Sequence, residues 1–184
     1  MLKYKKGLDE NVFVEGHMKS KEDIVETYKK MIIDKKSSRI TVKELCNHMK
    51  ISRPTFYKHF RDTYDILEYI LINDGIYQTR VLVDQKIDKL TITEAWYLSF
   101  YKNKDFYFYA IQDESQNSMF NTLITSISKL NRDYFIQSMT KQDAEYYAYK
   151  YASSQAMLLK KWILEGMTID PKKMAEYFMK DILN

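Results

Sequence analysis

Five side chains that can hydrogen bond to nucleic acid fall within seven residues of the chain: Arg53, Thr55, Tyr57, Lys58 and His59. In a helix, Phe56 and Phe60 are four residues apart and point to the same side, so the polar set would face outward. No carboxylate occurs between Lys50 and Arg61. Cations and hydroxyls with no neighbouring acid can bind phosphate oxygens and base edges of DNA. A helical hairpin with a merely solvated polar face is the alternative interpretation.

Other site chemistries lack the residues that they need. The three histidines, His17, His48 and His59, are not spaced as metal ligands, and the lone Cys46 gives no zinc pattern. The sequence has no glycine-rich phosphate loop, no dinucleotide-binding pattern and no nucleophile elbow. It therefore predicts a protein that is not an enzyme and that uses no metal or cofactor.

Two short helices must position the polar side chains. Thr41 and Glu44 form a capping box that begins the first helix. Its apolar residues then recur at helical spacing on one buried face, and they are Val42, Leu45, Cys46 and Met49. Ser52 caps the second helix, and Pro54 falls in its first turn, where a missing N–H costs nothing. The pattern predicts a helix-turn-helix.

The segment from about residue 20 to 68 resembles the DNA-binding domain of the TetR family of bacterial transcription regulators. The matching residues are Ile40-Thr41-Val42, Leu45-Cys46, Ile51-Ser52, Thr55-Phe56-Tyr57 and His59-Phe60. The resemblance implies that Lys43, Arg53, Pro54, Thr55 and Tyr57 lie near base edges. It likewise implies that Thr41, Ser52, Lys58 and His59 contact phosphates. Thr63 stands where the family usually has a lysine, and Arg61 is the candidate to replace that phosphate contact.

Composition indicates an all-α protein of modest charge. Only four glycines and two prolines occur in 184 residues, so long loops are scarce. The net charge is +4, so any basic patch must be local. No apolar run approaches about 18 residues, so no membrane span is expected. The single cysteine fits a reducing compartment, and we expect a cytoplasmic protein.

Three regions are predicted along the chain. Residues 1–18 are interpreted as a disordered arm or a cloned leader ahead of a natural start at Met18, and residues 19–64 as the DNA-binding domain. Residues 65–184 would form a helical regulatory and dimerisation domain, giving about nine helices in all, the usual number in the TetR family. Gly75 falls within a long helix, where it either loosens the helix or packs closely against a neighbour.

Two further surfaces are expected in the second region. A ligand pocket could use its aromatic residues, although such a stripe is more often core, and the candidates are Trp96, Phe100, Tyr101, Phe106, Tyr109, Phe120, Tyr134, Met157 and Trp162. The last two helices carry more apolar surface than one small domain must bury. Their predicted dimer interface consists of Tyr147, Tyr151, Gln155, Leu158, Met174 and Phe178.

The favoured function is a ligand-responsive repressor that binds a palindromic DNA operator as a homodimer. Its partners would be operator DNA, a second copy of the chain and an unknown small-molecule effector. Residues 95–115 also resemble, more weakly, a TetR subgroup that includes regulators of dihydroxyacetone kinase operons. The alternative is a helical dimer, activators included, that a protein co-regulator controls and that has no small-molecule ligand.

Overall fold

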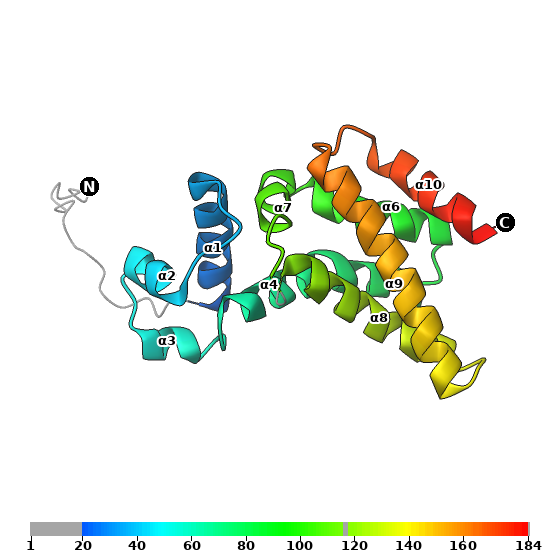
Figure 1. Ribbon diagram of the computed structural model, residues 1–184, viewed down its shortest axis with the longest axis horizontal. Coiled ribbons are helices and arrows are strands. Elements are labelled where there is room, and N and C mark those ends of the chain that lie inside the picture. Colours follow the sequence, from blue (N-terminus) through cyan, green and yellow to red (C-terminus); the bar gives the residue numbers. More distant parts are fainter. Residues whose placement is uncertain (1–19, 116–117, 184) are drawn as a thin grey trace, which may run out of the picture.

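The computed structural model describes residues 20–115 and 118–183, and every regular element within them is a helix (Figure 1). In chain order these are α1 (Lys21–Lys35), α2 (Val42–Met49), α3 (Arg53–Tyr57), α4 (Thr63–Leu71), the π-helical turn η1 (Ile72–Ile76), α5 (Tyr77–Asp84), α6 (Lys89–Tyr101), α7 (Lys104–Ala110), α8 (Met119–Phe135), α9 (Lys141–Leu164) and α10 (Pro171–Leu183). Because α4, η1 and α5 are continuous, the described residues contain nine helices, which confirms the all-α prediction. The arm predicted for residues 1–18 lies outside the described residues.

Helices α1, α2 and α3 form a small unit, which we call the head, at one end of the molecule (Figure 1). Capping boxes begin α1 at Ser20 and α2 at Thr41, as the sequence predicts. The centre of the head is fully buried, and its largest side chains are Tyr28, Phe56, Ile24, Ile32 and Leu45. The burial of these side chains fixes the angle between the three helices.

Helices α6 to α10 form a larger unit, which we call the body, at the other end (Figure 1). The long helix α9 packs along α8, and α10 packs against α6. Four alanines spaced four residues apart are fully buried on one side of α9: Ala144, Ala148, Ala152 and Ala156. Their small side chains allow a neighbouring helix to approach closely. No helix in the described residues is long and apolar enough to cross a membrane.

The continuous helix Thr63–Asp84, which we call the linking helix, joins the head to the body. Its π-helical turn contains Gly75, and a Cβ added there would lie 2.8 Å from Cζ3 of Trp96 in α6. Close packing at Gly75 is therefore observed, and the helix is also irregular at this residue, because Gly75 lies within the π-helical turn. The Thr79 hydroxyl lies 3.2 Å from the Gly75 carbonyl and 2.9 Å from that of Ile76, so it serves the carbonyls of this irregular turn.

Three helix boundaries in the body differ from those that the sequence pattern predicts. Thr91 and Glu94 have the spacing of a capping box and so predict a helix start at Thr91. They do not cap a helix, because the Asp88 carboxylate accepts the Thr91 N–H at 3.0 Å and α6 already begins at Lys89. Asn103 makes no capping hydrogen bond, and its amide donates instead to Asp74 at 3.3 Å. Helix α8 spans Met119–Phe135, which is shorter than the 115–139 that its apolar stripe predicts.

Candidate DNA-binding interface

The first helix of the predicted pair is held by a network at its N-terminus. Glu44 accepts hydrogen bonds from the Thr41 N–H at 2.8 Å and the Thr41 hydroxyl at 2.7 Å. Lys35 donates to the same carboxylate at 2.7 Å. The hydrogen bond from Lys35, with those from Thr41, lowers the pKa of Glu44 to about 2. The Thr41 hydroxyl thus has a partner already, and it would contact a phosphate only by sharing or exchanging that hydrogen bond.

A sharp turn joins α2 to α3. Lys50 adopts the left-handed conformation (φ 55°, ψ 40°) that ends α2. The Ile51 N–H then donates to the Cys46 carbonyl at 3.0 Å, and the half-buried Ile51 packs on the core. The Ser52 hydroxyl accepts the Thr55 N–H at 3.2 Å and begins α3. These bonds place α3 beside α2 (Figure 1).

Helix α3 presents one polar side and one aromatic side. Phe56 and Phe60 are buried, with ring centroids 6.3 Å apart. Tyr57 is 55% exposed, and its ring meets the Phe56 ring edge-on at 5.4 Å. The contact with the buried Phe56 ring supports one side of the Tyr57 ring, and the rest of the Tyr57 side chain is exposed to solvent.

All of the predicted DNA-binding residues lie at the surface of the head. Seven are exposed, namely Thr41, Lys43, Ser52, Arg53, Pro54, Tyr57 and Lys58, and Thr55 and His59 are half-buried. Within the described residues, Lys43, Arg53 and Lys58 have no carboxylate partner. Unpaired lysines and arginines of this kind are the side chains that can neutralise anions such as DNA phosphates.

Arg61 differs from these three cations. Its guanidinium lies 3.3 Å from the Asp65 carboxylate and 3.9 Å from that of Glu68, and its backbone N–H donates to Asp65 at 2.9 Å. A phosphate would therefore have to compete with two carboxylates for this side chain. Asp65 is four residues from Arg61, so the sequence already carries the signal of this pairing.

The predicted ligand-pocket residues do not converge on one cavity among the described residues. Trp96, Phe100, Phe106 and Trp162 are buried in the core, whereas Tyr109 and Phe120 are half-buried at its edge. Two members are exposed and line separate open grooves. Tyr101 borders a groove of about 300 Å³ between α6 and residues 167–171, and Met157 borders one of about 480 Å³ between α9 and α10. The side chain of Tyr134 lies outside the described residues.

Three polar side-chain atoms of the body are buried without a hydrogen bond among the described residues, and they are Trp96 Nε1, the Tyr97 hydroxyl and the Ser153 hydroxyl. Trp96 and Tyr97 are neighbours in α6, and the sequence analysis singled out only Trp96. The Trp96 ring contacts Phe100, with centroids 4.9 Å apart, and the Tyr97 ring meets Trp162 edge-on at 5.5 Å. Buried polar groups are nearly always satisfied, so these two are candidates to receive a ligand or water. Burial raises the pKa of Tyr97, so its hydroxyl stays protonated as a donor.

Three of the six predicted dimer residues line one groove of the body. Tyr151, Leu158 and Phe178 line the space between α9 and α10, together with Lys150 and Lys161 at its rim. Tyr147 is exposed on the preceding turn of α9, and Gln155 is half-buried. Met174 is 3% exposed within a single chain, so it belongs to the core beneath this face. In the described part of the chain, no cluster of His, Cys, Asp or Glu could hold a metal ion.

The comparisons with known proteins concern the body. Residues 90–184 match the family model TetR_C_8, which describes the C-terminal region of transcriptional regulators. The match covers half of the chain, and it lies outside the helix-turn-helix. None of the curated proteins matches the chain. The body and the head therefore point to the same class of protein through different residues.

Proposed function

Because the chain belongs to the TetR family of DNA-binding transcriptional regulators, we propose that it is a ligand-responsive repressor that binds a palindromic operator as a homodimer. Each protomer would insert α3 into a major groove, and the two reading helices would lie one helical turn of DNA apart, about 34–36 Å. The DNA-binding domain would comprise residues 19–64 and the regulatory and dimerisation domain residues 65–184, so that the boundary between the two domains falls in the first turn of α4, at the start of the linking helix.

The observation that carries this proposal is the exposed surface of α2 and α3. Arg53 is exposed at the N-terminus of α3, and no acid lies between it and Arg61. An arginine in this position can donate two hydrogen bonds to a guanine edge, whereas Lys58 and Lys43 can neutralise phosphates. Pairing leaves Arg61 a weaker candidate for a phosphate contact.

The groove between α9 and α10 supports the dimer. Leu158, Tyr151 and Phe178 give it an apolar floor on the surface of a single chain. Two copies related by a two-fold axis would bury this floor against its equivalent, which closes a four-helix bundle. Tyr147 and Gln155 would lie at the edge of that contact.

The unpaired donors in α6 support an effector site inside the body. A small molecule with hydrogen-bond acceptors on an otherwise apolar frame would satisfy Trp96 Nε1 or the Tyr97 hydroxyl. Such a ligand would have to open space in a packed aromatic core. The weaker resemblance to dihydroxyacetone kinase regulators finds no support in the family match, and the identity of the effector does not follow from it.

One observation favours a protein co-regulator as the second candidate. Tyr146 is 72% exposed and Tyr149 is 61% exposed on α9, outside the groove assigned to the dimer. Exposed tyrosines provide rigid contact area for a protein partner. In this case the aromatic body would be core and interface only, and the chain, repressor or activator, would bind no small molecule of its own.

The first test is selection of bound DNA from a random pool, repeated at several salt concentrations. A palindromic site whose affinity falls steeply with salt is the expected result, because phosphate contacts release counterions. The double variant Arg53→Ala/Lys58→Ala serves as the matched control and should select nothing. Weak, sequence-blind binding by the unchanged chain would refute operator recognition without an added ligand or partner.

Light scattering tests the dimer. Leu158→Arg places a charge in the α9–α10 groove and should yield monomers, because an unpaired buried charge is costly. The control is Tyr77→Arg, since Tyr77 is 60% exposed on α5 and away from the groove. A dimeric Leu158→Arg variant would exclude this face.

Thermal shift against a small-molecule library separates the effector from the co-regulator. A stabilising compound should lose most of its effect in Trp96→Phe, which removes the buried N–H and keeps an aromatic ring at that position. A library without any stabiliser would favour the protein co-regulator.

A further inference from the structure

The head contacts the body along a seam between α1 and α7, which lie side by side in Figure 1. Tyr28 and Phe106 meet edge-on at the centre of the seam, with ring centroids 6.5 Å apart, and both side chains are buried. Apolar contact of this kind holds the two units together but is non-directional. It therefore does not by itself fix how the head is turned relative to the body.

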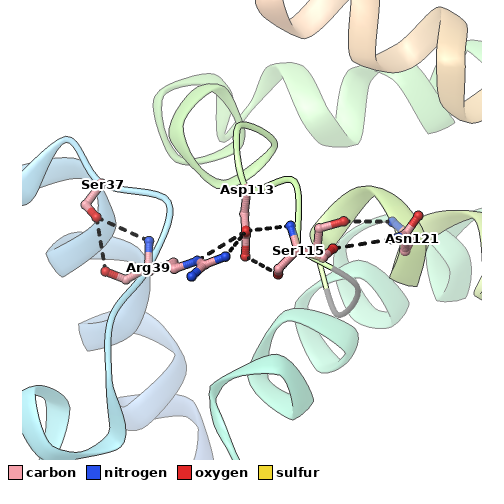
Figure 2. Close-up of polar contacts among 6 residues, drawn as sticks. Ser37, Arg39, Asp113, Ser115 and Asn121 are labelled. Carbon is pink, nitrogen blue, oxygen red and sulfur yellow. Dashed lines mark hydrogen bonds and ion pairs between the residues drawn. The ribbon is translucent and has the colours of Figure 1, made fainter.

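Figure 2 shows a charged contact at one end of the seam. Arg39, in the link between α1 and α2, donates to Asp113 Oδ1 from Nε at 3.2 Å and from Nη2 at 2.8 Å. The Asp113 side chain is 2% exposed and the Arg39 side chain 61%. Asp113 also accepts the Ser115 N–H and hydroxyl, each at 2.9 Å. The carboxylate is therefore saturated, and Arg39 is its only partner from the head among the described residues.

The link that carries Arg39 is itself constrained. The Arg39 N–H donates to the Ser37 hydroxyl at 3.2 Å, and that hydroxyl donates to the Arg39 carbonyl at 3.1 Å (Figure 2). Two residues further on, Thr41 caps α2. The position of Asp113 is thus transmitted through a short, hydrogen-bonded link to the first helix of the reading pair.

A second charged contact ties α1 to the linking helix. Asp74 Oδ2, in the π-helical turn, accepts Lys29 Nζ from α1 at 3.0 Å. The same oxygen accepts the Tyr107 hydroxyl from α7 at 3.1 Å and the Asn103 amide at 3.3 Å. Lys29 and Asp74 are both mostly buried. One carboxylate oxygen therefore joins the head, the linking helix and the body.

We propose that Asp113 and Asp74 are positioning residues that fix the orientation of the DNA-binding head against α7, so that α7 as well as the linking helix determines which spacing of operator half-sites the protein accepts. The inference rests on the proposed function. Its physical basis is that charge-assisted hydrogen bonds are directional, and that a buried carboxylate without its partner is costly. The Arg39–Asp113 ion pair therefore forms in one geometry. While this ion pair is formed, the head has one orientation relative to the body.

The test measures operator spacing in Arg39→Gln, which changes an exposed side chain and should leave the fold intact. The DNA is the site selected from the random pool, with zero, one or two base pairs inserted between its halves, and a single half-site. One inserted base pair should weaken binding by about tenfold in the unchanged protein but only about twofold in the variant, in the range of typical coupling energies. Affinity for the single half-site should not change, since no DNA-contacting residue is altered.

Lys35→Gln is the matched control, because it breaks an ion pair of similar length, Lys35–Glu44 at 2.7 Å, that lies wholly within the head. In Lys35→Gln, one inserted base pair should still weaken binding by about tenfold, as in the unchanged protein. Asp113→Asn, as the second variant, should behave like Arg39→Gln, and Arg39→Lys should recover part of the penalty because it keeps the charge. Equal penalties in all of these proteins, at unchanged melting temperatures, would overturn the inference.

A distance measurement decides the matter without DNA. Spin labels on exposed residues Asn47 in α2 and Lys102 after α6, with buried Cys46 replaced by Ala, report the head relative to the body. Excess unlabelled protein removes signals between protomers. The distance distribution should be narrow in the parent and in Lys35→Gln but broad in Arg39→Gln, and a narrow distribution in Arg39→Gln would contradict the proposal. Should the unchanged protein show no spacing preference, the palindromic dimer fails and this distribution alone decides the inference.

Discussion

Tyr57 in α3 is exposed and turned toward solvent, whereas Tyr97 in α6 and Tyr107 in α7 are completely buried in the body. The same contrast holds for the charged groups. Lys43 and Lys58 of the head have no carboxylate partner among the described residues, but Asp74 and the body's Asp113 each accept hydrogen bonds from several donors. The exposed cations of α2 and α3 are thus available to an external partner, whereas Asp74 and Asp113 hold the head, the linking helix and the body together.

The contrast between buried and exposed side chains is tested most strongly by two alanine substitutions at neighbouring positions of α3. Phe56→Ala should lower the free energy of unfolding by about 3–5 kcal/mol, because it empties a buried aromatic site. Tyr57→Ala, one residue away, should change it by less than about 1 kcal/mol while weakening binding to every DNA sequence. Urea unfolding and DNA titration measure the two effects. Equal destabilisation by both changes would show that Tyr57 is structural.

Gly75→Ala tests the packing of the linking helix against the body. The new Cβ would lie 2.8 Å from Trp96, so the free energy of unfolding should fall by about 1–3 kcal/mol through overpacking. Trp96→Phe removes ring atoms that the new Cβ would meet. Adding Gly75→Ala to Trp96→Phe should therefore cost much less stability than adding Gly75→Ala to the parent protein. Thermal unfolding measures the stability of the four proteins in this double-mutant cycle. Additive losses of stability would mean that the two sites do not interact.

Arg53→Ala and Lys58→Ala sharpen the assignment of roles within the head. The first should cost about 1–3 kcal/mol of binding free energy and relax the base preference at one position. The second should weaken binding uniformly and reduce the slope of affinity against salt by about 1. Selection of DNA with each variant distinguishes them. An unchanged preferred site for Arg53→Ala would remove that residue from the base edges.

The smallest expected effect is a loss of stability at acidic pH. It compares the partly exposed carboxylate of Glu44 with the buried carboxylate of Asp113. Burial raises the pKa of Asp113, but the hydrogen bonds from Arg39 and Ser115 outweigh burial and leave the pKa below its ordinary value. A folded-state pKa below the unfolded one gives stability that is present at neutral pH and is lost as the pH falls below about 4. Melting temperature recorded from pH 7 to pH 3 measures that loss.

In Arg39→Gln the buried Asp113 loses its cation, so its folded-state pKa should rise to or above the unfolded value. The variant should then be less stable than the parent at neutral pH, and this carboxyl should cause little or no further loss of stability as the pH falls. Lys35→Gln should raise the pKa of Glu44 from about 2, with a smaller effect because both side chains of that pair are largely solvated. An identical acid profile for both variants would show that burial of Asp113 has no bearing on stability.

Local chemistry made most of the helix starts predictable. Thr41 and Ser52 cap the helices that the sequence analysis assigns to them, and Ser20 and Thr140 have the same spacing to an acidic residue and cap α1 and α9, since each cap acts over three residues. The prediction at Thr91 was wrong because Asp88, three residues earlier, offers the same backbone a carboxylate. The sites assigned to DNA and to the dimer remain predictions, although all nine DNA-binding candidates lie at the surface.

Contacts between distant segments were not predictable in this way. Arg39 and Asp113 are 74 residues apart, and neither stands in a motif. Helical spacing also could not distinguish Met157, which faces solvent, from Trp162, which is buried on the same helix. Such distinctions depend on which faces of α9 the other helices cover, and that is decided by tertiary packing.

The π-helical turn at residues 72–76 has a geometric consequence for the whole molecule. A π turn is an α-helix with one extra residue, and each residue of an α-helix advances the chain by about 100° around the axis. The π turn takes up that residue as a local widening of the helix, so its effect falls on the residues of the turn itself. Deleting one residue there would change the side of the helix on which Asp74 lies, so the extra residue keeps Asp74 where it meets both Lys29 of α1 and Tyr107 of α7.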